Sequence, residues 1–161
     1  MEGLIVLLAS AAVLVFVFFP KATSDARSAF DDLILYYAKK EGLPFSILKA
    51  VVRRESNFNP KAWNDERKKG DASDDAIGLM QIRQGALTDY NNAHGTSSDM
   101  DDLIYPAINL KVGSWYLGRL IKKHGINAGV EMYNVGESGY LSGKRSTKYL
   151  AAVLGFSRNY T

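Results

Sequence analysis

One carboxylate in the chain lies where its surroundings suit acid–base chemistry. Glu55 belongs to the stretch VRRESNFNP, near the end of an apolar segment that the sequence predicts to be helical. It comes four residues after Val51 and seven after Leu48, which places it on the buried face of that helix. Burial disfavours the charged form of a carboxyl and raises its pKa, which is the property of a general acid near neutral pH.

The two arginines before Glu55 bear on whether Glu55 is a buried, functional acid or a solvated charge at the end of the helix. Arg53 and Arg54 are turned roughly 100–200° away from Glu55 around the helix, so we expect both to reach water. The alternative is that Glu55 is a solvated charge at the helix end. An acid in the last turn, however, interacts unfavourably with the helix dipole and destabilises the helix by about 0.3–1 kcal/mol. The sequence shows no structural contact that would compensate this cost. The pattern alone leaves both interpretations open.

The composition excludes several other kinds of site. The 161 residues contain no cysteine, which rules out disulfides, zinc–thiolate sites and thiol catalysis. His94 and His124 are too few and too scattered for a metal site, and no glycine-rich phosphate loop is present, so we expect neither metal nor cofactor. The net charge of +3 weakly favours acidic partners such as anionic glycans or phospholipids. No basic run with interleaved aromatic residues supports nucleic-acid binding.

The elements that must position Glu55 are predicted to be helices joined by loops. Residues 28–42, 44–57 and 106–125 have helical periodicity, with glycine or proline at their ends. INAGVEMYNVG and STKYLAAVLGFSRNY predict two more helices. Residues 61–76 predict an exposed polar loop, and IGLMQI predicts a short apolar turn or strand piece. Little of the chain has strand periodicity, so the domain is expected to be all-α or nearly so.

The N-terminal segment has a different character. Residues 3–19 carry no charge, and as a helix they would span roughly 25 Å, close to the minimum for a membrane crossing. A secretory signal peptide is the alternative, but Glu2 stands where such peptides carry basic residues and no A-x-A site follows. We therefore expect a transmembrane anchor or uncleaved signal-like segment, a linker and one compact domain, over residues 1–20, 21–27 and 28–161.

Four stretches occur in an order that resembles a known family: ESNFNP, AIGLMQI, PAINLKVGSWYL and MYNVG. They are similar to the signature of the Slt-type (family 1) lytic transglycosylases, relatives of goose-type lysozyme that cleave bacterial cell-wall glycan. STKYLAAVL also resembles the closing helix of that family. The resemblance covers about residues 25–156 and implies a mainly α, lysozyme-like fold for the compact domain.

The resemblance also implies roles for individual residues. Glu55 matches the single catalytic acid of the family, and Ser56 matches the hydroxyl beside it. Tyr133 would orient Glu55 by a hydrogen bond, and Asn134 would contact sugar. Gln81 and the backbone of the GLMQI turn would line the sugar groove. Met80 is assigned to substrate binding with simple core packing as its alternative, and core packing is equally open for Leu79 and Ile82. Tyr149 is left between core and groove, whereas Asn109 and Gly113 are expected to be structural.

Some positions depart from the family pattern. Gly78 follows Glu55 by 23 positions, more than is usual, so ERKKGDAS looks inserted. RQGALT follows the GLMQI turn where proline and threonine are usual, Tyr105 replaces an acid, and Met132 replaces an alanine. These departures leave the loop shape and the details of the sugar subsites open.

The resemblance implies a mechanism that needs one acid. Glu55 would protonate the glycosidic oxygen between N-acetylmuramic acid and N-acetylglucosamine. It would then take the proton from the sugar's own 6-hydroxyl, which closes a 1,6-anhydro ring. Two alternatives stay open. One is a hydrolytic muramidase with Asp71, Asp74 or Asp75 as second carboxylate, and the other is an inactive membrane-anchored protein that binds glycan within an assembly.

The expected partners are peptidoglycan strands and, through residues 3–19, a membrane. A wall-cutting domain on a single-pass anchor suits local widening of peptidoglycan for a secretion apparatus or for a phage particle that delivers the enzyme from its membrane or tail. The sequence does not choose between the periplasm of a bacterium and a virion. The lack of a clear signal peptide favours a virion component.

Overall fold

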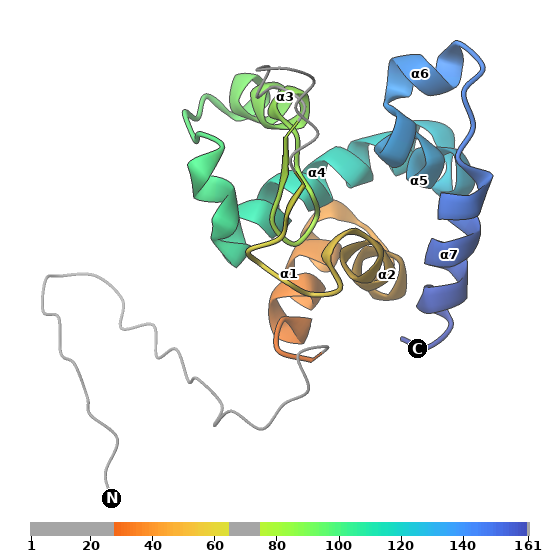
Figure 1. Ribbon diagram of the computed structural model, residues 1–161, viewed down its shortest axis with the longest axis horizontal. Coiled ribbons are helices and arrows are strands. Elements are labelled where there is room, and N and C mark those ends of the chain that lie inside the picture. Colours follow the sequence, from red (N-terminus) through yellow and green to blue (C-terminus); the bar gives the residue numbers. More distant parts are fainter. Residues whose placement is uncertain (1–27, 65–74, 161) are drawn as a thin grey trace, which may run out of the picture.

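The computed structural model describes residues 28–64 and 75–160, which form a mainly helical domain. The prediction of an all-α or nearly all-α domain is confirmed for these residues. Figure 1 shows the helices packed around one another. In chain order the elements are α1 (Asp31–Glu41), α2 (Phe45–Ser56), β1 (Trp63–Asn64), β2 (Ala76–Ile77), α3 (Gln84–His94), the 3₁₀ helix η2 (Asp101–Ile104), α4 (Pro106–His124), α5 (Ile126–Val135), α6 (Glu137–Leu141) and α7 (Thr147–Ser157).

Local signals explain where the predicted helices begin and end. α1 has acids in its first turn and lysines in its last turn, which complements the helix dipole. Gly42 ends α1 in the left-handed conformation, with φ at 68°, which glycine adopts without strain. Pro44 precedes α2, and Pro106 is the first residue of α4, where its missing N–H costs no helical hydrogen bond. All three helices agree with the prediction apart from their terminal residues.

α3 and α6 were not predicted from the sequence. α3 is polar and buries only Leu87 and Tyr90, so it lacks the apolar stripe that marks a helix in sequence. α6 has five residues, none of them buried. Helices this short or this polar are marginal by themselves, because helix nucleation is costly and packing supplies most of their stability. Their formation therefore depends on the elements around them.

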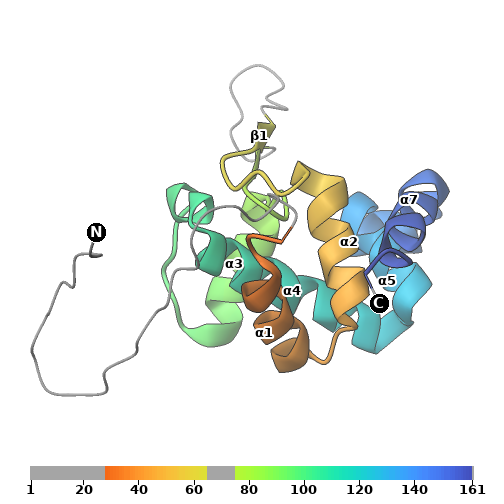
Figure 2. The ribbon, with the colours of Figure 1, turned by 90° about the horizontal axis from the view of Figure 1, so that it is seen from below.

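α4 lies at the centre of the domain, as its apolar sequence predicts. It packs against α1, α3 and α5, and Figure 2 shows it between α3 and α5. Leu110 and Leu117 are fully buried, and Leu120 is 1% exposed. Each buried leucine contributes about 1.5–3 kcal/mol relative to an exposed one. This helix is the rigid support on which the remaining elements are assembled.

The arrangement of α2 and α7 matters most for Glu55. These helices are far apart in sequence, yet they pack together and lie side by side in both views (Figures 1 and 2). Phe156 and Tyr160, at the end of α7, pack with the apolar core. The packing brings the last turn of α2 against Tyr149 of α7, whose hydroxyl contacts Glu55.

The turn that follows β2 is held by one buried amide. Asn109 of α4 donates from Nδ2 to the carbonyl oxygens of Ile77 and Leu103, at 2.8 and 2.9 Å, and accepts from the N–H of Met80 at 2.8 Å. Gly78 has φ at 78°, and a Cβ there would lie 2.2 Å from Asn109 Nδ2. Only glycine fits this position. The structural role predicted for Asn109 is confirmed.

The prediction of an exposed loop over residues 61–76 is wrong near both ends of that range, where residues form a small sheet or are buried. Trp63 and Asn64 pair antiparallel with Ile77 and Ala76, and both Asp75 and Ala76 are buried at 3% exposure. Two-residue strands carry no readable alternation, which is why the sequence pattern does not predict them.

The remaining expectations about domain organisation lie outside the described residues. The anchor and linker predicted over residues 1–27, and the acids Asp71 and Asp74, belong to the parts that the structure does not describe. Within residues 28–64 and 75–160, no helix combines the length and the apolar character that a membrane crossing requires.

Candidate active site

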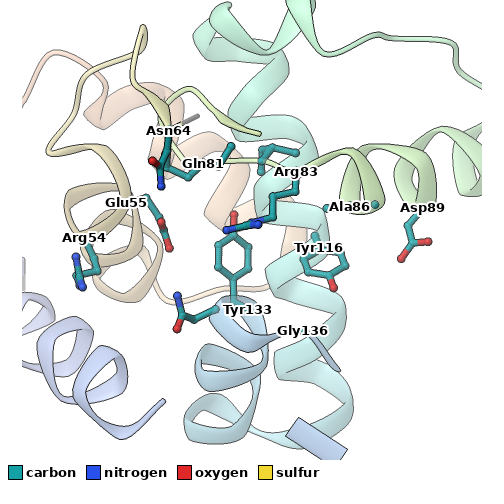
Figure 3. A pocket seen from close by; sticks show the side chains of 14 residues that line it. Arg54, Glu55, Asn64, Gln81, Arg83, Ala86, Asp89, Tyr116, Tyr133 and Gly136 are labelled. Carbon is teal, nitrogen blue, oxygen red and sulfur yellow. The ribbon is translucent and has the colours of Figure 1, made fainter. Parts of the chain in front are cut away.

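A pocket of about 570 Å³ opens where α2, the small sheet, α3, α4 and α5 meet. Figure 3 shows Glu55, Gln81 and Tyr133 on its walls, each from a different part of the chain. Its size is in the range of small-molecule sites. Glu55, Gln81, Tyr133 and Asn134, four residues assigned from the sequence, are brought together here.

Glu55 lies in the last turn of α2 and points into this pocket. Its Oε1 accepts a hydrogen bond from the Tyr149 hydroxyl. Burial raises the pKa of the Glu55 carboxyl above its ordinary value, and this effect outweighs the Tyr149 hydrogen bond and the charges of Arg54 and Arg83, which lower it. The raised pKa predicted from the helix face is confirmed.

The expectation that Arg53 and Arg54 both turn into water is wrong for Arg53. Its guanidinium carbon lies 4.0 Å from the centre of the Phe156 ring, and Nη1 donates to the Tyr160 hydroxyl at 3.3 Å. Arg54 is exposed, but it lines the pocket and lies 5.6 Å from the centre of the Tyr149 ring. Helical phase could not show this, because α7 covers that side of α2.

The hydrogen bond expected between Tyr133 and Glu55 is made by Tyr149 instead. The Tyr133 hydroxyl donates to the carbonyl oxygen of Met80 at 2.8 Å. Burial, followed by the negative charge of Glu55, raises the pKa of both tyrosines well above their ordinary value. Both phenols therefore stay protonated and act as donors. Core packing and a place in the groove were both left open for Tyr149. Its side chain is 4% exposed, as in the core, and its hydroxyl reaches Glu55.

The GLMQI turn contributes Gln81 and Ile82 to the pocket. Gln81 has φ at 49°, and its Nε2 donates to the carbonyl oxygens of Ala62 and Gly78 at 3.2 and 3.1 Å. Met80 is fully buried in the core and is not part of the pocket wall. Ser56 donates from Oγ to the Leu79 carbonyl oxygen at 2.8 Å, so it holds the turn beside Glu55.

α5 and the start of α7 are joined through Ser146. The Ser146 N–H donates to Glu131 Oε2, and Ser146 Oγ donates to Asn134 Oδ1, each at 2.6 Å. Glu131 is 6% exposed. A carboxylate at a helix N-terminus satisfies an otherwise unpaired N–H and complements the dipole. These contacts fix the beginning of the helix that carries Tyr149.

Of Asp71, Asp74 and Asp75, the candidates for a second catalytic carboxylate, Asp75 belongs to the described residues. Asp75 accepts a hydrogen bond from the Trp63 indole at 3.2 Å and is not part of the pocket wall. Asp89 does line the pocket, but Arg119 pairs with it at 3.1 Å. Among the described residues, no group of three or more His, Cys, Asp or Glu side chains could hold a metal ion.

The sequence did not predict a place in the pocket for several of its lining residues, namely Arg54, Asn64, Arg83, Tyr116 and Asp89. Tyr116 has a readable signal, because it lies seven residues after Asn109, two turns along the same helix. The positions of Asn64, Arg83 and Asp89 depend on how the small sheet and α3 fold around the GLMQI turn, and they carry no comparable signal.

Comparison with known proteins gives a family and a fold. The model of the Transglycosylase SLT domain matches residues 32–152. An inactive mutant of the lytic transglycosylase Slt from Pseudomonas aeruginosa has 24% identity over 83% of this chain, with a TM-score of 0.61. The 70-kDa soluble lytic transglycosylase of Escherichia coli has 26% identity over 81%, with a TM-score of 0.60.

A complex of the 70-kDa soluble lytic transglycosylase with bulgecin A has 26% identity over 84% of this chain, with a TM-score of 0.61. The chain covers 22% of the length of each of these three solved proteins. No curated protein matches the chain.

Proposed function

The chain belongs to the SLT transglycosylase domain family, and from this premise we propose that it is a lytic transglycosylase of bacterial peptidoglycan. Its substrate is the β-1,4 bond between N-acetylmuramic acid and N-acetylglucosamine, and its product ends in a 1,6-anhydro-muramoyl sugar. The observation that carries this proposal is Glu55, a carboxyl of raised pKa on the wall of a pocket large enough for sugar.

Glu55 acts first as the acid. Tyr149 donates to Oε1, so the acid proton belongs on Oε2. Transfer of that proton to the glycosidic oxygen breaks the bond to the sugar C1 and releases the leaving sugar as an alcohol. The muramoyl C1 then carries the positive charge of an oxocarbenium-like centre, which its own N-acetyl group helps to stabilise. A carboxyl that is still protonated near neutral pH is the group this step requires.

Glu55 acts next as the base. The Glu55 carboxylate takes the proton of the 6-hydroxyl, and the 6-oxygen forms a bond to C1, which closes the anhydro ring. The proton is thereby returned to Glu55 and no water is consumed. The Tyr149 hydrogen bond holds the carboxyl in place through both steps. Asn134 and Gln81, which line the pocket, are proposed to contact the sugar.

Among residues 28–64 and 75–160, the arrangement of acids favours this reaction over hydrolysis. Two-carboxylate glycosidases place the groups about 5–5.5 Å apart when retaining and about 6.5–9.5 Å apart when inverting. Figure 3 shows Asp89 on α3 beyond Ala86, on the other side of Arg83 and Tyr133 from Glu55. Arg119 also holds it in an ion pair. A substrate hydroxyl that serves as nucleophile removes the need for a second carboxylate.

The products of purified murein test the proposal. Anhydro-muramoyl ends resist borohydride reduction, whereas hydrolysis creates reducing ends. We expect anhydro ends from the full chain and a loss of rate of about a hundred- to ten-thousandfold in Glu55→Gln, the range expected when a general acid is removed. Unfolding of Glu55→Gln by heat serves as the folding control.

Two results would contradict the proposal. If all new ends were reducible, the chain would be a muramidase. If Glu55→Gln, with its fold intact, cleared cell walls as well as the unaltered chain, the protein would be a glycan-binding component of an assembly and not an enzyme.

A further inference from the structure

Two cations on α2 hold a tyrosine that follows α7. Lys49 and Arg53 are four residues apart, so they lie on the same face of α2. The Lys49 Nζ lies 4.7 Å from the centre of the Tyr160 ring, and Arg53 Nη1 donates to the Tyr160 hydroxyl at 3.3 Å. One helix therefore binds this tyrosine both at its ring and at its hydroxyl.

The Lys49 side chain is itself fixed in place. Lys49 is 6% exposed, and its Nζ pairs with Asp31, the first residue of α1, at 2.6 Å. The same Nζ lies 5.5 and 6.0 Å from the centres of the Phe45 and Phe58 rings. Buried lysines are rare unless they are paired, and a cation–π contact is stronger where water is excluded. Tyr160 is thus held against a fixed point of the domain.

Tyr160 continues the face of α7 that carries Tyr149. Tyr149, Val153 and Phe156 recur at helical spacing, and Tyr160 follows in the turn that ends the helix, where its N–H donates to the Ser157 carbonyl oxygen at 3.1 Å. Tyr149 and Val153 are the buried residues of α7. Phe156 and Tyr160 are partly buried against the core. They therefore hold the far end of α7 against α2.

The two ends of α7 together determine where the Tyr149 hydroxyl lies. The start of the helix is fixed at Ser146, whose N–H donates to Glu131. If the far end were released, α7 could tilt about this fixed start and turn the Tyr149 ring with it. The hydroxyl is at the tip of a long side chain, so a small rotation displaces it. The hydrogen bond to Glu55 would weaken, because such bonds depend steeply on distance and angle.

We propose that Tyr160, held by Lys49 and Arg53, is a positioning residue for Glu55 and acts through α7 and Tyr149. This proposal rests on the proposed function and adds to it a residue outside the pocket wall. Tyr160 touches neither Glu55 nor the pocket, so its contribution lies in the orientation of the helix that it holds.

The pH dependence of the reaction reports on this orientation. The neighbours whose charges or hydrogen bonds interact with the Glu55 carboxyl are Tyr149 on α7, Arg54 on α2, Arg83 directly before α3 and Tyr133 on α5. Of these, Tyr149 is on the helix that Tyr160 holds. Its hydrogen bond lowers the pKa of Glu55, so a weaker bond raises that pKa and the acid keeps its proton to higher pH.

The experiment measures kcat and KM for anhydro-product formation by the full chain over a range of pH. For Tyr160→Ala we expect kcat at the optimum to fall about tenfold, because the carboxyl is less well positioned. The alkaline limb of kcat/KM should move to higher pH. KM should change less than about twofold, because Tyr160 is not part of the pocket wall. Tyr160→Phe keeps the ring beside Lys49 and should restore most of kcat.

A double-mutant cycle separates positioning from a general loss of stability. In a Tyr149→Phe chain the hydrogen bond to Glu55 is already absent, so Tyr160→Ala should change kcat less than about twofold there. Tyr105→Ala is the matched control, since Tyr105 is an exposed tyrosine directly before α4 and is not part of the pocket wall. It should leave kcat and the alkaline limb unchanged. Heat unfolding of each variant sets an assay temperature at which all are folded.

Each outcome bears on one proposal. An unchanged kcat and alkaline limb in folded Tyr160→Ala would overturn the positioning role and leave the proposed function standing. The same loss of kcat with and without Tyr149→Phe would also overturn it, because destabilisation alone acts equally in both chains. If the unaltered chain formed no anhydro product, the proposed function would fail. Titration of the Glu55 carboxyl by NMR in the full chain would then decide the role of Tyr160, which requires a higher Glu55 pKa in Tyr160→Ala than in the unaltered chain; equal values would overturn it.

Discussion

At the scale of single residues, the protonation of Glu55 depends on a balance between burial and three neighbours. Burial raises the pKa of its carboxyl, whereas the Tyr149 hydrogen bond lowers it most among the opposing effects, followed by the charges of Arg54 and Arg83. Tyr149 keeps its proton, because its own pKa is raised well above the ordinary value, and its hydroxyl donates to Glu55. The same phenol therefore orients the acid and moderates its pKa.

Tyr149→Phe should separate these two contributions. Loss of the hydrogen bond removes an effect that lowers the Glu55 pKa, so that pKa rises and the acid keeps its proton to higher pH. We expect the alkaline limb of the kcat/KM profile to move upward while kcat at the optimum falls roughly ten- to hundredfold, because the carboxyl is less well positioned. The measurement is a pH profile of anhydro-product formation.

Tyr133→Phe is the comparison for this prediction. The Tyr133 hydroxyl donates to the Met80 carbonyl oxygen and not to Glu55. The alkaline limb of the kcat/KM profile of Tyr133→Phe should therefore lie at the same pH as that of the unaltered chain. A shift in Tyr133→Phe with none in Tyr149→Phe would show that the hydrogen bond to Glu55 is assigned to the wrong tyrosine.

At the scale of elements, the relation between α5 and α7 controls the position of Tyr149. Glu131 accepts from the Ser146 N–H and Asn134 accepts from the Ser146 hydroxyl, at the residue before α7 begins. Tyr149 follows three residues later, in the first turn of α7. A change at Glu131 can thus reach the active acid without touching substrate.

Glu131→Ala should destabilise the start of α7. We expect a loss of about 1–2 kcal/mol in the free energy of unfolding, the usual cost of a lost helix cap, together with a several-fold lower kcat. Glu131→Gln retains an oxygen acceptor for the Ser146 N–H and should restore most of both quantities. Chemical denaturation and product assays measure them. Equal loss in the two variants would mean that the charge of Glu131, and not its hydrogen bond, is what matters.

At the scale of the whole molecule, a compact domain provides the chemistry and the apolar segment over residues 3–19 is proposed to hold it at a membrane. That segment lies outside the described residues, so its role remains a proposal from its length and lack of charge. Anchoring would restrict cleavage to the wall nearest the membrane.

A chain shortened to begin near Ser24 tests this role. We expect the full chain to sediment with membranes and the shortened chain to remain in the supernatant, because removal of the uncharged, mainly apolar segment over residues 3–19 abolishes insertion. We also expect the shortened chain to open walls over a wider area, as measured by labelling of new anhydro ends on isolated sacculi. An equally restricted pattern from both chains would show that confinement is not the purpose of the segment.

The sequence by itself determined the features that depend on neighbours along the chain. Helical periodicity together with glycine and proline signals placed α1, α2 and α4, and the phase of α2 placed Glu55 on the buried side. The ordered motifs added Gln81, Tyr133 and Asn134, which all line one pocket. These features are local, because caps and periodicity act within a few turns.

Only the tertiary structure decided which groups surround Glu55. Its hydrogen bond comes from Tyr149, 94 residues away, and not from Tyr133. Arg54, in the last turn of α2, and Arg83, directly before α3, line the same pocket. Side-chain direction across an interface depends on the packing of whole helices, and no spacing within one helix records it. Glu55 can therefore be predicted from the sequence, whereas the side chains that surround it are determined by the packing of the helices.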